Sequence, residues 1–261
     1  MSQNMRVTEI SSKDNSVFRN MKKLLTSKGI KDEKCFLLMG EKLISEFIRS
    51  QILESKNSLF KIKSVITFDE RPFPLLEAEA NLKLKKELFN ELDVLGTHYP
   101  MLLLEYFELK EPNLLDSPQG LEIISPLGDP KNLGALSRSA LGFGASKIIL
   151  TKESCHPYLP HTIKASAGAI LNIPIYYTGL DTNELPLVGE NFALNLHGQK
   201  VHDITWPKNL RLWVGEEGPG LHLSMDQKRK IKMITIPTSG IESLNATVST
   251  SIAMWEWAKR H

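Results

Sequence analysis

Short apolar runs alternate with helical or loop stretches along the C-terminal half of the chain. The apolar runs, each an expected strand, span residues 121–125, 147–150, 173–177, 192–196, 212–214 and 233–236. Apolar runs spaced in this way are typical of a mainly parallel sheet that is covered on both faces. The pattern therefore predicts an α/β fold for this part of the chain.

The N-terminal part has fewer expected elements. Val17, Met21 and Leu24 share one stripe of a helix predicted over residues 13–28, and Gly29 is a natural left-handed cap for its end. The remaining pattern predicts strands at 36–39, 61–68 and 101–104, and a helix at 41–51 after the break at Gly40. These elements indicate a separate small α/β unit.

A polar stretch divides the two parts. The regular pattern lapses between Glu105 and Gly120, where Pro112 and Pro118 interrupt helices and strands. A chain of 261 residues also exceeds the usual size of one domain. We therefore expect an N-terminal domain at 1–108, a linker at 109–119 and a second domain at 120–261.

Composition and charge narrow the class of protein only slightly. Hydrophobic residues make up 41% and charged residues 24%, as in ordinary globular proteins, and no run of 18 apolar residues or secretory signal is present. A cytoplasmic protein without membrane spans is the expectation. Residues 1–63 hold 13 Lys or Arg against 7 Asp or Glu, although the net charge is only +2. This excess fits phosphate contacts by the first domain, but a solvated helix face carrying Lys22, Lys23 and Lys28 explains it equally well.

The sequence predicts no metal site. Cys35 and Cys155 are far apart and lack metal-ligand spacing, so both are expected to be reduced thiols. The two histidine pairs that invite a metal interpretation are five residues apart in expected loops, without a cysteine or carboxylate cluster; they are His156 with His161 and His197 with His202.

Ligands of parallel sheets gather at the carboxyl ends of the strands, and the loop after residues 121–125 is the first of three unusual loops there. It contains Gly128, Asp129 and Pro130 and opens a helix that we expect to reach about Phe143. Free N–H groups at the start of such a helix favour an anion. Arg138 is expected one turn into the helix, within reach of the same edge.

The second loop reads GEEGPGL and places Gly215, Gly218 and Gly220 within six residues. Glycine permits positive φ and a close approach of backbone to a ligand. The loop is neither a phosphate loop, since no Lys-Ser or Lys-Thr follows, nor a dinucleotide fingerprint. A glycine-rich turn without a ligand is the simpler alternative.

The third stretch, from Met233 to Trp257, reads as a strand, a loop and a helix that Asn245 caps. The pattern predicts an inward apolar stripe at Val248, Ile252 and Trp255. Taken alone, this is a capped helix that closes the core.

Together the three loops resemble, in order and spacing, the three motifs of the SpoU/TrmH-type branch of the SPOUT methyltransferases. The first motif is carried by Asp129, Pro130, Asn132, Gly134, Arg138, Ala140, Phe143 and Gly144, the second by Gly215, Glu217, Gly218, Gly220 and Leu221, and the third by Ile236, Pro237, Ser243, Leu244 and Asn245. The resemblance covers residues 120–261. It implies transfer of a methyl group from S-adenosylmethionine to a ribose 2'-hydroxyl, a deep trefoil knot, and a homodimer with the active site near its interface.

The resemblance also implies a set of site residues. The cofactor-binding residues would be Asn195, His197, Gly198, Gly215, Glu216, Gly218, Gly220, Leu221, Ile236, Ser243, Leu244 and Asn245. The catalytic residues would be Asn132, Arg138, Glu217, Ser243 and Asn245. Arg138 would meet a phosphate beside the target ribose rather than remove a proton, since guanidinium holds its proton. Asn132 and Ser243 are also ordinary turn or cap formers.

The first domain is similar, through FLLMGEKLISEFI, to the family's substrate-binding domain, whose fold is like that of an RNA-binding ribosomal protein. Met39 stands where the family often has glutamate, and Ala246, Thr247 and Ser249 also depart from its third motif. The expected partner is ribosomal RNA, with transfer RNA as the alternative. A catalytically silent RNA-binding protein and a nucleotide-dependent metabolic enzyme are the competing functions.

Overall fold

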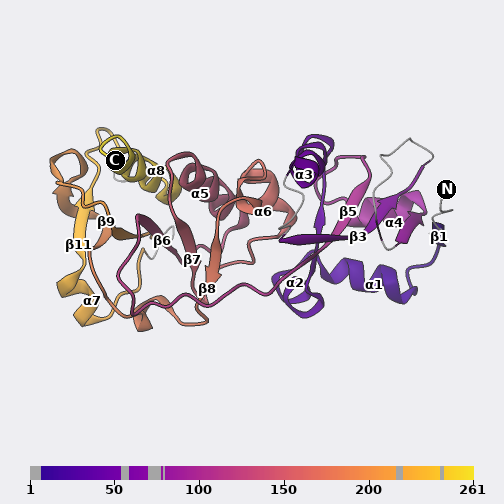
Figure 1. Ribbon diagram of the computed structural model, residues 1–261, viewed down its shortest axis with the longest axis horizontal. Coiled ribbons are helices and arrows are strands. Elements are labelled where there is room, and N and C mark those ends of the chain that lie inside the picture. The colour runs from indigo at the N-terminus through magenta and orange to yellow at the C-terminus, as the bar shows by residue number, and fades with distance from the viewer. Residues whose placement is uncertain (1–6, 54–58, 70–77, 79, 216–219, 242–243) are drawn as a thin grey trace. The chain divides into compact units, whose positions relative to one another are not determined.

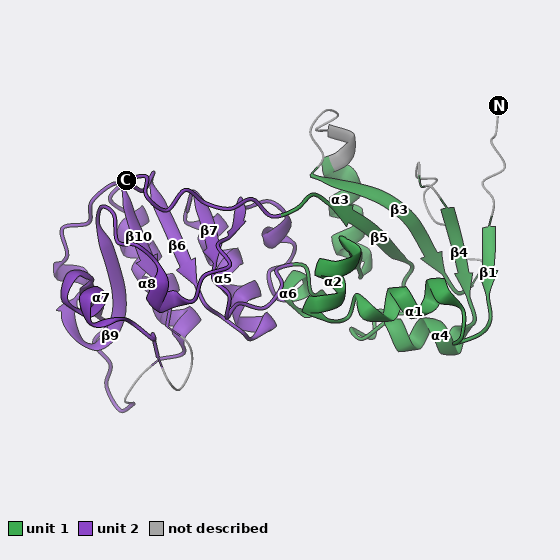
Figure 2. Cartoon of the chain, turned by 90° about the horizontal axis from the view of Figure 1, so that it is seen from below, with its two compact units in different colours: residues 1–108, 158–164 green, residues 109–157, 165–261 purple. Residues whose placement is uncertain are grey.

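The computed structural model describes residues 7–53, 59–69, 78, 80–215, 220–241 and 244–261. The chain divides into two compact units (Figure 2), one of residues 1–108 with 158–164 and the other of residues 109–157 with 165–261. Each unit is built around its own β-sheet.

The first unit has a mixed five-stranded sheet in the order β1-β4-β3-β5-β2. Its strands are β1 (Val7–Ile10), β2 (Cys35–Leu38), β3 (Phe60–Thr67), β4 (Ala80–Leu84) and β5 (Met101–Tyr106). Strands β1, β3 and β4 are parallel, and β5 runs antiparallel to β3 and β2. Its helices are α1 (Ser16–Lys23), α2 (Ser27–Glu33), α3 (Glu41–Leu53) and α4 (Lys86–Leu92). Helix α3 lies on the face of the sheet opposite to α1 and α2 (Figure 1).

The helix expected over residues 13–28 is wrong, because two helices occupy this region. Helix α1 ends before Leu24, and Thr26 caps α2 by accepting a hydrogen bond from the Gly29 N–H at 3.1 Å. Gly29 is thus inside α2 and is not a left-handed cap. A Cβ atom there would lie 2.0 Å from the Lys23 carbonyl oxygen, so glycine is needed for the close approach of the two helices.

The second unit has a six-stranded sheet in the order β11-β9-β10-β6-β7-β8, and all its strand pairs are parallel. The strands are β6 (Leu121–Ser125), β7 (Lys147–Leu150), β8 (Ile175–Tyr177), β9 (Asn191–Lys200), β10 (Leu210–Trp213) and β11 (Lys232–Thr235). The helices are α5 (Pro130–Gly142), α7 (Met225–Lys230) and α8 (Ala246–Ala258), with short 3-10 helices at Ala169–Leu171, Thr182–Glu184 and Val201–Asp203. Helix α6 (Pro160–Ala165) groups with the first unit through residues 160–164. The predicted α/β fold is confirmed.

Two hydrophobic clusters cover the two faces of this sheet. On β6, Ile123 packs into the cluster that contains α5 and α8, whereas Ile124 packs into the cluster beside α7. The same alternation occurs on β7 and β10, at Ile148 and Ile149 and at Leu212 and Trp213. Successive side chains of a strand point to opposite faces, so a buried parallel strand must be apolar throughout. This explains why the strands read as continuous apolar runs.

The segment at 109–119, expected to be a linker, packs on the second unit. Leu114 is buried in the cluster beside α7, and Lys110 forms an isolated parallel bridge with Tyr176. Residues 158–164 belong to the first unit, where Tyr158 stacks on Phe36 with ring centroids 4.8 Å apart. The sequence pattern did not set this short segment apart from its surroundings.

Helix α8 packs against α5 with a different face from the one expected. Its buried residues include Thr247, Thr250, Ala253, Met254 and Trp257. Val248 and Trp255 are 48% and 50% exposed, so the predicted inward stripe is wrong. Small residues of α8 make polar contacts with α5: the Thr247 hydroxyl donates to the Asn132 carbonyl at 3.3 Å, and the Ser251 and Ser139 hydroxyls lie 2.7 Å apart.

The part of the chain that the structure describes contains no group of three or more His, Cys, Asp or Glu side chains arranged to hold a metal ion. Within the same residues, no helix combines the length and apolar character needed to cross a membrane.

Candidate active site

A pocket of about 1170 Å³ lies at the carboxyl ends of β9, β10 and β11. Three segments meet there: the end of β9, the loop after β10 and the loop between β11 and α8. The lining residues are Leu194, Asn195, Leu196, His197, Lys200, Gly215, Gly220, Leu221, Leu223, Lys228, Met233, Thr235, Ile236, Pro237, Thr238, Leu244, Asn245, Ala246 and Ser249. This is the edge at which parallel sheets bind ligands.

A break in strand register places β9 side chains at the pocket. Met233 of β11 pairs with Ala193, but the next residue, Ile234, pairs with Gln199, so residues 194–198 leave the regular ladder. Within this excursion the His197 N–H donates to Asn195 Oδ1 at 3.0 Å, and the Thr235 hydroxyl donates to the Leu196 carbonyl at 3.2 Å. These bonds hold Asn195 and His197 at the pocket, where the sequence analysis expected them to lie.

Gly198 is placed by packing rather than by the pocket. It is absent from the described pocket lining, and a Cβ atom at this position would lie 2.6 Å from the backbone carbonyl of Met233. Only glycine therefore lets β9 approach β11 this closely. The structure thus gives Gly198 a backbone-packing role and brings it no contact with the pocket.

The loop after β10 contributes Gly215, Gly220 and Leu221 to the pocket. Gly220 has φ of +71°, a conformation that L side chains adopt only with strain. The predicted site residues Glu216, Glu217 and Gly218 lie outside the described residues.

The segment between β11 and α8 contributes Ile236, Leu244 and Asn245. The Asn245 side chain caps α8, accepting hydrogen bonds from the Thr247 and Val248 N–H groups at 2.9 and 3.2 Å. This cap fixes the start of the helix against the pocket. Ser243, the remaining predicted residue of this segment, lies outside the described residues.

Asn132 and Arg138 lie on α5 and do not line the pocket. The Asn132 N–H donates to the capping Asp129 carboxylate at 2.8 Å, and its carbonyl accepts from the Thr247 hydroxyl at 3.3 Å, next to the cap of α8. Arg138 follows Pro130 by eight residues, which is about 12 Å along the axis. The expectation that it lies one turn into the helix is therefore wrong, because the Asp129 cap starts the helix at Pro130.

Arg138 is exposed, and its guanidinium forms no hydrogen bond or ion pair with any residue that the structure describes. It shares the exposed face of α5 with Leu141, which is 40% exposed. The residue is thus available to a partner outside its own chain.

Sequence reasoning missed several residues of the pocket. Lys200 follows the β9 excursion, and no pattern of alternation predicts a five-residue break in register. Leu223 lies in the segment before α7, and Lys228 lies in α7. The sequence pattern indicated no function for this region. Among the described lining residues there is no Asp or Glu, whereas Lys200 and Lys228 supply positive charge.

This chain matches the model of the SpoU rRNA Methylase family, and the match spans residues 123–255. The matched region contains every described segment that lines the pocket.

Two curated relatives align with nearly all of the chain. A protein of Syntrophobacter fumaroxidans named ribosomal RNA small subunit methyltransferase G 2 is 32% identical over 256 residues; the alignment covers 96% of this chain and 49% of the relative. The chain therefore spans about half the length of that relative. The 23S rRNA (guanosine(2553)-2'-O)-methyltransferase of Bacillus subtilis is 25% identical, and the alignment covers 95% of this chain and 98% of the relative.

Solved structures share the fold over both units. An rRNA methyltransferase from Sinorhizobium meliloti, crystallised with S-adenosylmethionine, aligns with a TM-score of 0.73 and 22% identity over 98% of each chain. The SpoU methyltransferase AviRb from Streptomyces viridochromogenes aligns with a TM-score of 0.77 and 18% identity, over 94% of this chain and 98% of its own. The parallel sheet and the pocket at its carboxyl edge agree with the family match over residues 123–255. The chain therefore belongs to the SpoU rRNA methylase family.

Proposed function

We propose that this protein transfers a methyl group from S-adenosylmethionine to a ribose 2'-hydroxyl of ribosomal RNA. The observation that carries the proposal is the convergence of the second and third sequence motifs on one pocket, at the carboxyl edge of a parallel sheet. Ribosomal RNA is preferred to transfer RNA because the Bacillus subtilis relative, which aligns over nearly its full length, is named for 23S rRNA.

The pocket residues fit this cofactor. Its apolar side chains, including Leu221, Ile236 and Leu244, suit a purine ring, and its loop backbones offer hydrogen-bonding groups without a side chain in the way at Gly215 and Gly220. The cofactor supplies an activated methyl group on a sulfonium. We assign its binding to Asn195, His197 and these three segments, together with Glu216, Gly218 and Ser243.

Positioning is the main task of the protein in such a transfer, because the donor is already activated. We assign to Arg138 the binding of a phosphate beside the target ribose, for which the planar guanidinium is suited. Asn132, Ser243 and Glu217 would orient the ribose or the pocket around it. Asn245 would hold the pocket's edge in place through its cap on α8.

We further propose that the protein is a homodimer in the cytoplasm, and that α5 and α8 form its interface. Val248 and Trp255, on one side of α8, are each about half exposed, and Leu141 of α5 is 40% exposed beside Arg138. Large apolar side chains grouped on neighbouring helices are typical of an interface. A second copy on this face would place Arg138 near the partner's site. We also expect the trefoil knot of the family.

We assign RNA substrate binding to the domain at 1–108, with 109–119 as the connection and 120–261 as the catalytic domain. The basic excess of residues 1–63 is in part neutralised, since Lys22 pairs with Glu91 at 2.7 Å and Lys23 with Glu33 at 3.1 Å. For these two lysines the solvated-face interpretation is therefore the better one. Lys28 and other cations remain candidates for RNA contact.

The direct test is transfer of a labelled methyl group from S-adenosylmethionine to protein-free ribosomal RNA and transfer RNA, each in a separate reaction. Digestion to nucleosides and mass spectrometry then identify the modified atom. The proposal predicts a 2'-O-methylnucleoside in ribosomal RNA. A methylated base would contradict the reaction, and methylation confined to transfer RNA would contradict the substrate. Binding of both ligands without transfer would favour a silent RNA-binding protein.

A further inference from the structure

Two lysines line the pocket from different elements. Lys200 ends β9 and Lys228 lies in α7, and both side chains are exposed. Neither forms an ion pair or side-chain hydrogen bond with a residue that the structure describes.

Two neighbouring lysines that do not line the pocket are paired. Lys230 of α7 contacts Asp226 at 2.8 Å, and Lys232 of β11 contacts Glu190. Of these four lysines, the two that line the pocket are therefore the ones without a counter-charge among the described residues. Arg229 of α7 does not line the pocket and also has no counter-charge among the described residues, so the case for a ligand charge rests on the position of Lys200 and Lys228 in the pocket wall.

The cofactor alone does not account for this positive charge. S-adenosylmethionine carries a sulfonium, an ammonium and a carboxylate, so its net charge is positive, and nearby lysines disfavour it. No Asp or Glu among the described lining residues offsets them, and Glu216 and Glu217, which the proposed function assigns to this site, lie outside the described residues. The complementary ligand is a polyanion, and phosphates of an RNA strand have the required charge.

We propose that Lys200 and Lys228 bind RNA phosphates at the mouth of the pocket, and that this neutralisation couples RNA binding to binding of the cationic cofactor. The inference rests on the proposed function and adds two RNA contacts to it. Lysine suits this position because its ammonium is a mobile point charge on a long stem, able to follow a flexible backbone. Reciprocity requires that RNA then strengthens the binding of S-adenosylmethionine.

The first test compares Lys200→Met and Lys228→Met with the control Lys230→Met. Methionine keeps an unbranched stem and removes the charge. Filter binding to protein-free bacterial 23S ribosomal RNA across a salt series should show weaker binding for both test variants. Each should lower the salt slope by about 0.7 to 0.9, the amount for one phosphate contact. The control, whose lysine pairs with Asp226, should keep the parental slope.

The second test measures binding of S-adenosylmethionine and of S-adenosylhomocysteine by calorimetry without RNA. The product lacks the sulfonium charge. Removing both lysines should strengthen binding of S-adenosylmethionine about two- to fivefold, the size expected for unit charges about 10 Å apart in a wet site. Binding of S-adenosylhomocysteine should change less. Added RNA should strengthen S-adenosylmethionine binding to the parent more than to the double variant.

An unchanged salt slope in both test variants would overturn the inference. So would an equal loss of affinity for both cofactor forms, because that result would assign the lysines to the methionine carboxylate. A parent protein that binds neither RNA nor S-adenosylmethionine would instead contradict the proposed function.

Discussion

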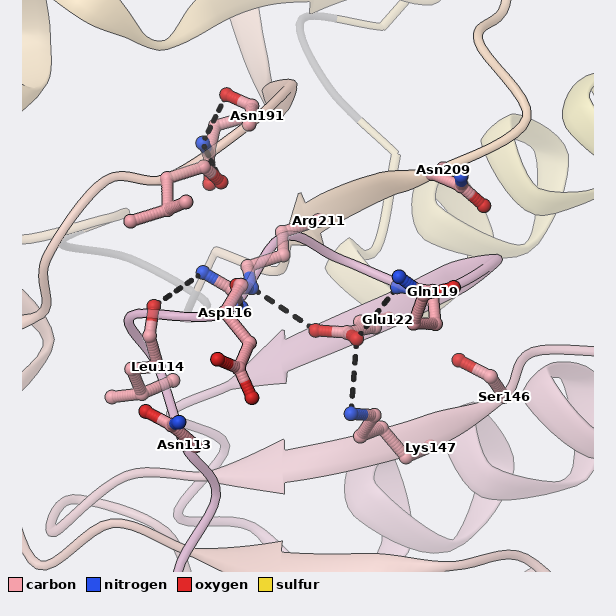
Figure 3. A network of polar contacts seen from close by, with 12 residues as sticks. Asn113, Leu114, Asp116, Gln119, Glu122, Ser146, Lys147, Asn191, Asn209 and Arg211 are labelled. Atoms are coloured by element: carbon pink, nitrogen blue, oxygen red, sulfur yellow. Dashed lines mark hydrogen bonds and ion pairs between the residues drawn. The ribbon is translucent and has the colours of Figure 1, made fainter.

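Arg211 and Glu122 form a buried ion pair in which the Arg211 Nε–H donates to Glu122 Oε2 at 3.0 Å. The two side chains are 2% and 1% exposed. The other guanidinium nitrogens donate to the carbonyls of Leu114 at 3.0 Å and Asp116 at 2.7 Å (Figure 3). Glu122 and Arg211 lie near the amino ends of β6 and β10, whereas the pocket lies at the carboxyl ends of the strands. The pair therefore holds residues 114–116 against the end of the sheet opposite to the pocket.

The pair makes stability depend on the charge of Glu122. Burial by itself would raise the pKa of this carboxyl, but the Gln119 N–H, Lys147 and Arg211 together hold the pKa below its ordinary value. A carboxyl with a lowered folded pKa stabilises the fold above its unfolded pKa of about 4.3. That contribution is lost as the pH falls through the folded pKa.

Glu122→Gln should lower the free energy of unfolding at pH 7 by about 3 to 5 kcal/mol, because Arg211 remains buried without its counter-charge. Urea unfolding at several pH values between 7 and 3 measures the effect. The difference between variant and parent should shrink toward low pH, where the parental carboxyl is also neutral. A difference that stays constant over this range would show that the charge of Glu122 is not what stabilises the fold.

Gly220→Val should abolish most binding of S-adenosylhomocysteine, because a β-branched side chain cannot adopt the φ of +71° without strain and would change the pocket wall. Gly179→Val is the matched control, since Gly179 has φ of +70° but does not line the pocket. Calorimetry on the folded proteins compares the two. Equal affinity of Gly220→Val and the parent would show that the cofactor binds elsewhere.

Arg138→Ala should reduce methyl transfer at least about 100-fold while cofactor affinity stays nearly parental, since Arg138 lies on α5 away from the pocket lining. Arg138→Lys should rescue poorly, because lysine lacks the planar fork that binds a phosphate through two hydrogen bonds. Single-turnover transfer with saturating RNA and cofactor separates rate from binding. Lys131→Ala, an exposed cation on the same helix, serves as control. Parental rates in both Arg138 variants would leave this residue without a role in the reaction.

Trp255→Asp should dissociate the proposed homodimer, because burying a carboxylate in an apolar interface is costly. Val248→Asp, on the same side of α8, should act in the same direction. Sedimentation over a range of protein concentrations reports the mass, and Leu180→Asp is a control at an exposed leucine outside α5 and α8. A dimer that survives both α8 changes must use another surface, and a monomeric parent would refute the dimer itself.

The sequence predicted elements best where one local signal was decisive. Two strands, β6 and β7, have the predicted bounds, and Asn245 caps α8 as expected, because apolar runs and side-chain caps act within a few residues. The failures depend on packing between elements. Gly29 allows two helices to touch, and α8 faces α5 with Thr247 and Ser251 rather than with its apolar stripe.

The candidate active site shows the same contrast between local sequence signals and packing between elements. Loops of the second and third motifs line one pocket, whereas the first-motif residues Asn132 and Arg138 do not line it. Of the expected cofactor residues, eight line the pocket: Asn195, His197, Gly215, Gly220, Leu221, Ile236, Leu244 and Asn245. Gly198 failed to reach it because its role is set by the neighbouring strand, and Lys200 was missed because a break in register presents it. Both depend on the pairing of β9 with β11, which the sequence of either strand alone does not reveal.

Mass-spectrometric mapping of ribose methylation in total RNA, from cells with the gene, without it, and with the gene restored, tests the proposed reaction in the cell. We expect one 2'-O-methylated position in ribosomal RNA that disappears on deletion, returns with the parent gene and stays absent with Arg138→Ala. Ribosomal RNA whose ribose methylation is identical in all these strains would contradict the proposed reaction.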